Sequence, residues 1–204
     1  MKEDGLSAAV EGFYPPVGDG NGKYYVESAR LRDFIRDSSI TCNARWLTSA
    51  FTGKTYNMQY STIPGWHATD LLPAFWDTDL ENNTLGFLLS ILLPGFSAFS
   101  DAYKSYLTSF VRTGNPNTYR AARASPSTIN WPVAQVGSGE QIAGVLDARM
   151  AGFSLIDDDQ NLKTSCDFWL NFQAAVTSAG GYAPPGSVVA SSLLNVNSGA
   201  SANY

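Results

Sequence analysis

His67 is the only histidine in this chain of 204 residues, so any imidazole chemistry must use it. An imidazole titrates near neutral pH and can take a proton from a nucleophile and return it to a leaving group. His67 follows the turn Pro64-Gly65, which comes soon after a predicted strand that ends at Tyr60. Loops at the carboxyl ends of strands line the active crevice of open α/β sheets. A lone histidine is more often structural than catalytic, and this setting strengthens the case for a general base.

The acidic residues near and beyond His67 are interpreted as structural. Asp70 is expected to be a helix N-cap or a loop anchor rather than the acid of a catalytic triad, and Asp37 an ion-pair or capping residue. Asp157–Asp159 are expected to begin a helix that runs to about Val176, because negative charge suits that end of the helix dipole. These three aspartates lack the glycine and glutamate spacing of a calcium loop, so we expect no metal site and no cofactor.

The two cysteines, Cys42 and Cys166, permit only one pairing. On a chain-entropy argument a bridge across such a long loop stabilises by at most about 5 kcal/mol. The count alone leaves two interpretations open, a disulfide and two unrelated buried thiols.

Composition limits the classes of protein and partner. The chain is 44% hydrophobic and 13% aromatic, which is enough for a packed core. Its net charge of -5 and its 13 scattered Lys and Arg residues argue against a nucleic-acid partner. The most apolar run, Leu85–Phe96, is broken by Pro94 and too short to cross a bilayer, so we expect no membrane span. A core helix is the favoured interpretation of this run, and an acyl-pocket lining the alternative.

Periodicity and turn signals predict the elements that must position these residues. Helices are predicted over Val26–Arg36, Ser39–Phe51 and Ala98–Arg112, with a short one beginning near Thr69 or Asp70. A strand is predicted over Thr55–Tyr60, and two edge strands over Val145–Leu146 and Phe153–Ile156, separated by a turn at Asp147–Gly152. We expect three parts: a loop-like segment 1–22, a folded part 23–180 and a flexible tail 181–204 rich in Gly, Ser and Asn.

Several segments in order resemble one family. They are D-S-S-I-T-C-N-A-R from Asp37, T-Y-N-M-Q-Y-S-T-I-P-G-W-H-A-T-D-L from Thr55, Y-K-S-Y-L-T-S-F-V-R-T-G-N-P-N from Tyr103, a W-P dipeptide and C-D-F-W. Together they resemble the cholinesterase-like type-B carboxylesterases and lipases, especially the fungal secreted members, from about Tyr14 to Gly186. The resemblance implies an α/β fold: the C-terminal portion of an α/β-hydrolase fold, with an incomplete mixed sheet flanked by helices.

The resemblance also implies roles for particular residues. The G-x-H-x-x-D/E-L pattern of the family places its catalytic histidine on His67, with Ala68 where many relatives have glycine. A family disulfide falls on Cys42 and Cys166, which implies an oxidising, extracellular compartment for the parent protein. The single N-glycosylation sequon, at Asn82, agrees with that compartment. The N-terminal residues show no secretory signal.

The chain departs from the family in what it lacks. No Gly-x-Ser-x-Gly occurs in the sequence, and no glycine-rich oxyanion loop. We therefore expect a carboxylic-ester hydrolase fragment that supplies the general base of a Ser-His-Glu/Asp triad. It would be inactive alone and would take an ester substrate only when completed by an upstream half. The alternatives are a non-catalytic binding or adhesion module on the same fold, a truncated gene product and a mispredicted reading frame.

Overall fold

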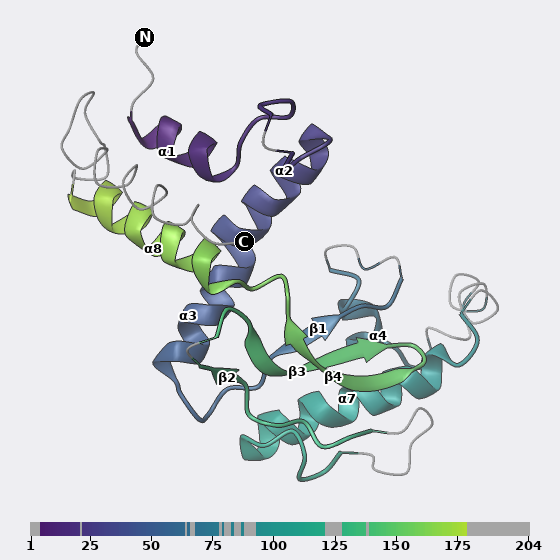
Figure 1. The fold of residues 1–204 in the computed structure, drawn as a ribbon. Helices are drawn as coiled ribbons and strands as arrows, with labels where there is room; N and C mark the ends of the chain where they lie inside the picture. The colour runs from purple at the N-terminus through teal and green to yellow at the C-terminus, as the bar shows by residue number, and fades with distance from the viewer. Residues whose placement is uncertain are drawn as a thin grey trace. The chain divides into compact units, whose positions relative to one another are not determined.

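A computed structural model describes residues 5–20, 22–63, 65, 68–77, 79, 83, 87, 93–120, 128–137 and 139–178 (Figure 1). His67, Asn82 and the expected tail 181–204 lie outside these residues, as does most of the apolar run Leu85–Phe96. The chain forms two compact units. The first comprises Met1–Leu47, Ser138–Gln141 and Asp159–Tyr204, and the second comprises Thr48–Gly137 and Ile142–Asp158.

The second unit is built on a mixed, open sheet of four strands. These are β1 (Met58–Tyr60), β2 (Gln135–Val136), β3 (Ile142–Arg149) and β4 (Gly152–Asp158). β1 pairs with β3 in parallel, whereas β2 and β4 pair with β3 antiparallel. With its flanking helices, this sheet confirms the expected α/β class with an incomplete mixed sheet.

β3 corrects one prediction from the sequence. Val145–Leu146 was expected to form an edge strand followed by a turn from Asp147, but β3 continues to Arg149 and pairs with the three other strands. The register of β3 against β4 shifts between Ile142 and Val145, the interval that contains Gly144. Gly144 has a φ of +76°, and a Cβ there would approach the Pro132 ring and the Val133 carbonyl to 3.3 Å. Only glycine accommodates both constraints.

One face of the sheet packs on α7 (Phe96–Thr113), which lies along it in Figure 1. Leu146, Ala148 and Phe153 on that face are at most 9% exposed. They meet the aromatic stripe of α7, which comprises Phe99, Tyr103 and Tyr106. Burying each large apolar side chain contributes roughly 1.5–3 kcal/mol. α7 ends one residue beyond the predicted Arg112, and Gly114 follows it in the left-handed conformation.

The first unit consists of helices. They are α1 (Gly5–Phe13), α2 (Glu27–Ile35), the π-helix η1 (Arg36–Thr41), α3 (Cys42–Ala50), whose last turn belongs to the second unit, and α8 (Lys163–Ser178). None of the helices in the described part of the chain is both long and apolar enough to cross a membrane.

Two local predictions in this unit were wrong. Residues 5–13, expected to be loop, form α1, because Leu6, Ala9, Val10 and Phe13 recur at helical spacing and pack in one cluster. The helix expected to begin at Asp157–Asp159 begins instead at Lys163. Asp157 and Asp158 end β4, so these carboxylates do not interact with a helix dipole.

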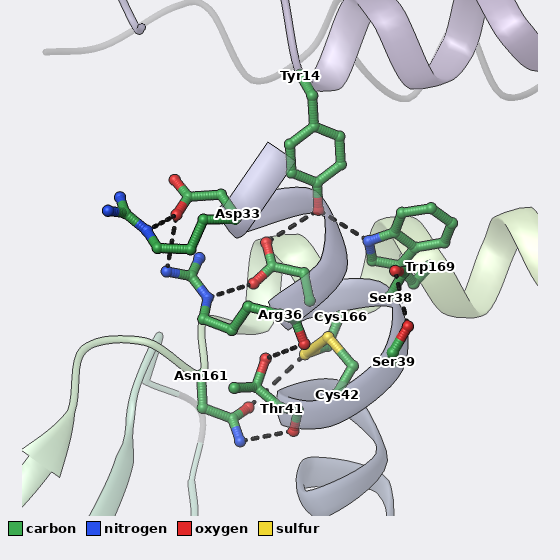
Figure 2. A network of polar contacts seen from close by, with 12 residues as sticks. Tyr14, Asp33, Arg36, Ser38, Ser39, Thr41, Cys42, Asn161, Cys166 and Trp169 are labelled. Atoms are coloured by element: carbon green, nitrogen blue, oxygen red, sulfur yellow. Dashed lines mark hydrogen bonds and ion pairs between the residues drawn. A yellow bond between two sulfur atoms is a disulfide. The ribbon is translucent and has the colours of Figure 1, made fainter. Parts of the chain in front are cut away.

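A buried polar network joins the helices of the first unit (Figure 2). The Tyr14 hydroxyl donates to Asp37 Oδ2 at 2.9 Å and accepts from Trp169 Nε1 at 2.8 Å. Asp37 is 2% exposed, and its Oδ1 accepts from Arg36 Nε at 2.8 Å. The prediction of Asp37 as a structural ion-pair residue is confirmed. Burial is the main cause of the pKa of Tyr14 lying well above its usual range, followed in the same direction by the Asp37 charge.

Beside this network lies the Cys42–Cys166 disulfide, which joins α3 to α8. The bridge settles the question that the cysteine count left open, in favour of the pairing that the resemblance implied. Arg45, one turn beyond Cys42, is 4% exposed and donates to the carbonyls of Glu140 at 3.0 Å and Asn161 at 2.8 Å. The guanidinium thus holds two connecting segments against α3.

Removing the disulfide tests how far this unit depends on it. The double substitution Cys42→Ala/Cys166→Ala is expected to lower the free energy of unfolding by up to about 5 kcal/mol, because the bridge restricts the unfolded chain. Urea denaturation followed by circular dichroism measures the loss. Reduction of the unsubstituted chain with dithiothreitol is the control and should give a similar loss. A midpoint unchanged by both treatments would contradict the role of the bridge.

Candidate active site

The candidate site is the loop from Ser61 to Asp70, which contains His67 and follows the carboxyl end of β1. Parallel pairing aligns β1 with the second half of β3: Met58 lies opposite Leu146 and Tyr60 opposite Ala148. β1 itself is only three residues long and half-buried. Its position is therefore fixed by β3, and the start of the loop with it.

The Ala148 carbonyl of β3 binds the two residues that follow β1. The backbone N–H of Ser61 donates to the Ala148 carbonyl oxygen at 3.0 Å, and the Thr62 hydroxyl donates to the same oxygen at 3.4 Å. Thr62 is 4% exposed. The first two residues of the loop thus remain attached to the central strand.

Two residues of the loop have left-handed backbone. Gly65 has a φ of +65° and Ala68 a φ of +68°. Ala68 is the one non-glycine residue with positive φ among those that the structure describes. Its Cβ makes this conformation cost about 1–2 kcal/mol more than glycine would. Ala68 directly follows His67 in the sequence, so backbone strain lies next to the predicted base.

The loop ends on α4 (Leu71–Phe75), which is fastened to α7. Ser100 Oγ on α7 donates to the Pro73 carbonyl at 2.7 Å, and Lys104 Nζ donates to the Trp76 carbonyl at 2.7 Å. Asp70 occupies the N-cap position of α4, as the sequence predicted, although its carboxylate makes no capping hydrogen bond. Both ends of the loop are therefore held by the packed core of the second unit.

A pair of tyrosines connects β1 to α7 near Asp70. The rings of Tyr60 and Tyr103 meet edge to face with their centroids 6.2 Å apart. Burial raises the pKa of Tyr103 from its usual 10.0 to about 12, with smaller contributions from the Asp70 charge and Tyr60. The pKa of Tyr60 is raised mainly by burial as well. Both phenols therefore stay neutral at physiological pH and offer hydrogen-bonding groups rather than charge.

The opposite face of the same strands carries a polar row that sequence reasoning missed. Register places Gln59 on β1 and Ser154 on β4 beside Asp147 on β3. Asp147 is fully buried, and its Oδ2 accepts from Arg149 Nε at 2.6 Å. Its Oδ1 accepts no hydrogen bond from any described residue. The sequence offered one sign of this polar row, the aspartate that follows Val145 and Leu146. A turn that begins at Asp147 accounts for an aspartate at that position equally well.

The structure does not gather the other predicted residues into this site. Asp37 and the Cys42–Cys166 bridge belong to the first unit, where they hold helices together. Within the described residues, no group of three or more His, Cys, Asp or Glu side chains is placed to hold a metal ion. The chemistry available to the loop is therefore that of its own side chains and of whatever group faces it.

Comparison with known proteins adds two relatives. Over 175 residues, 86% of its length, the chain is 34% identical to a protein named secreted lipase from Arthroderma benhamiae. It is 27% identical over 104 residues, 51% of its length, to the carboxylesterase patB of Penicillium expansum. The chain spans 32% of the first relative and 17% of the second. No family model and no solved structure matches it. The two similarities support a lipase/carboxylesterase family.

Relieving the strain at Ala68 is expected to stabilise the chain. Ala68→Gly removes the Cβ that the left-handed backbone disfavours, and this gain exceeds the added entropy of the unfolded chain, so the free energy of unfolding should rise by up to about 1 kcal/mol. Ala98→Gly in α7 is the matched control and should lower it by roughly 0.5–1 kcal/mol. Equal destabilisation by both substitutions, measured by urea denaturation, would show that Ala68 is not strained.

The raised pKa of Tyr103 predicts a loss of stability at alkaline pH. The Tyr103 phenol has a pKa near 10.0 in the unfolded chain and about 12 in the folded chain. Its contribution to the free energy of unfolding is complete below pH 10 and falls as the pH rises toward 12, because the unfolded chain loses the proton first. Tyr103→Phe should flatten the decline over this window. Unfolding midpoints at pH 8, 10 and 11 measure it, and the pH 8 value isolates the packing change. An identical decline in both proteins would refute the assignment.

Proposed function

We propose that this chain is the C-terminal part of a type-B carboxylesterase or lipase of the α/β-hydrolase fold, and that His67 is its general base. One observation carries the proposal. The segment Gly65–Leu71 follows the carboxyl end of a parallel strand in a chain 34% identical to a secreted lipase. Ligands of open α/β sheets bind beyond the carboxyl ends of the strands, so catalytic side chains are expected there.

The reaction proposed is hydrolysis of a carboxylic ester through an acyl-enzyme. A serine hydroxyl encoded upstream attacks the ester carbonyl while His67 takes its proton through one ring nitrogen. His67 then gives this proton to the departing alcohol. In the second half of the reaction His67 activates water, which releases the acid and restores the serine. An upstream acid holds the second ring nitrogen of His67 and stabilises the imidazolium.

The residues around the loop support this role by limiting its movement. Ser61 and Thr62 are tied to Ala148, and α4 is tied to α7 through Ser100 and Pro73. A base must be held within a fraction of an ångström of its productive position. A loop with both ends fixed to a packed core meets that requirement better than a free one.

The parent protein is proposed to be extracellular. The disulfide Cys42–Cys166 requires an oxidising compartment to persist, and one relative is named a secreted lipase. We propose Asn82 as its N-glycosylation site, on the sequon Asn82-Asn83-Thr84. Of the expected division into 1–22, 23–180 and 181–204, the flexible tail 181–204 remains a prediction, while the loop expected over 1–22 is replaced by α1 over part of its length.

A non-catalytic binding or adhesion module is the second candidate, favoured by the lack of a Gly-x-Ser-x-Gly in these residues. The reading frame upstream of this chain distinguishes the two. An intact nucleophile motif in frame supports the esterase, and a substituted serine in that motif supports the module.

Hydrolysis of p-nitrophenyl butyrate tests the proposed function. The purified chain alone is expected to show no turnover above buffer, because serine, acid and oxyanion donors are all absent from it. The protein encoded by the complete locus is expected to turn over, and His67→Ala in it should lower kcat by about 10⁴-fold or more. Asp70→Asn is the control and should retain most of the activity, since we assign Asp70 to the N-cap of α4.

Two results would contradict these expectations. Turnover by the chain alone that His67→Ala abolishes would show that a complete site lies within it. Undiminished turnover by His67→Ala in the complete protein would exclude His67 as the base.

A further inference from the structure

A hollow of about 370 Å³ lies within the first unit, between α1 and α2. Its apolar walls are Val10 on α1, Tyr14 just after it, and Leu31 and Phe34 on α2. Sites for small molecules measure roughly 300–1,000 Å³ and have mostly apolar walls with a few polar groups. The hollow is therefore large enough to hold a small organic molecule.

The wall made by Tyr14 is rigid. Its hydroxyl is bound by Asp37 and Trp169, and its carbonyl oxygen accepts from Arg30 Nε at 2.8 Å. Its ring meets Phe34 edge to face with centroids 5.7 Å apart. Tyr14 is 1% exposed, so it does not swing out to fill or close the space. A binding site that is already formed loses little entropy when a ligand enters.

One apolar residue of the lining remains exposed to solvent. Leu31 lines the hollow and is 57% exposed. When an apolar group covers an exposed aliphatic side chain, the free energy of the system falls. An alkyl chain lying against Val10, Leu31 and Phe34 would supply that cover.

The charged groups at the hollow neutralise one another. Arg30 NH1 lies 3.2 Å from Glu27 Oε2. The other oxygen of Glu27 accepts from the Val17 N–H at 3.3 Å. Because the cation and the carboxylate are already paired, neither an anionic nor a cationic headgroup is favoured. Ser28, also in the lining, and Glu27 offer a hydrogen bond to a neutral hydroxyl.

We propose that this hollow binds an uncharged amphiphile with one alkyl chain, in the class of medium-chain alcohols. The alkyl chain lies against Val10, Leu31 and Phe34, and the hydroxyl meets Ser28 or Glu27. The site is independent of ester cleavage, because every residue that forms it belongs to the first unit and none belongs to the loop of His67.

Isothermal titration of the full chain with 1-octanol, below its solubility limit, tests the proposal. We expect saturable binding to one site, and roughly tenfold weaker binding of 1-hexanol, as two fewer buried methylenes imply. Octanoate and octylammonium should both bind more weakly than 1-octanol. Absence of saturable binding by the folded chain, or tighter binding of either charged ligand, overturns the proposal.

A matched pair of substitutions locates the site. Leu31→Gln should weaken 1-octanol binding about tenfold, because it removes apolar contact from the lining of the hollow. Leu47→Gln changes a leucine of equal exposure, 59% against 57%, that does not line the hollow, and should leave the affinity unchanged. Both positions are surface positions, so circular dichroism should show both variants folded. Equal affinity in the two variants would place the binding elsewhere and refute the assignment.

Discussion

The pairing of β1 with β3 is the constraint on which the candidate site depends. β1 is too short to define its own position, and the residues that it meets on β3 are more than 80 positions away in the sequence. Once Tyr60 lies beside Ala148, the carbonyl of Ala148 also binds Ser61 and Thr62. The loop that carries His67 therefore starts at the end of β1 with its first two residues bound to β3, the strand with which the three others pair.

The two faces of this sheet contribute differently to the stability of the second unit. Leu146 and Ala148 bury one face against α7, and α7 in turn holds α4 and closes the loop. Asp147, between them in sequence, is fully buried on the other face with one carboxylate oxygen unpaired among the described residues. Burying a carboxylate with incomplete hydrogen bonding is costly, so the apolar face must supply the stability that the polar face reduces.

The first unit adds covalent and polar links to its apolar packing. It has no sheet within the described residues, and its helices are joined by the Cys42–Cys166 bridge, the Tyr14 network and the carbonyl contacts of Arg45. An apolar cluster that includes Ala9, Tyr14 and Phe168 adds to these links. The bonds to Asp37 and Trp169 hold Tyr14, which forms one wall of the hollow.

The sequence by itself determined what depends on neighbours along the chain: the extent of α7 to within two residues, the helical start after Asp70, and the interpretation of Asp37 as an ion-pair or capping residue. It also singled out His67 by motif, and its resemblance implied the cysteine pairing. Only the tertiary structure decided that β3 is central and that Asp147 is buried, because strand order and burial follow from partners remote in sequence. The strain at Ala68 belongs to the same group, since a backbone angle is set by both anchored ends of the loop and not by the residue itself.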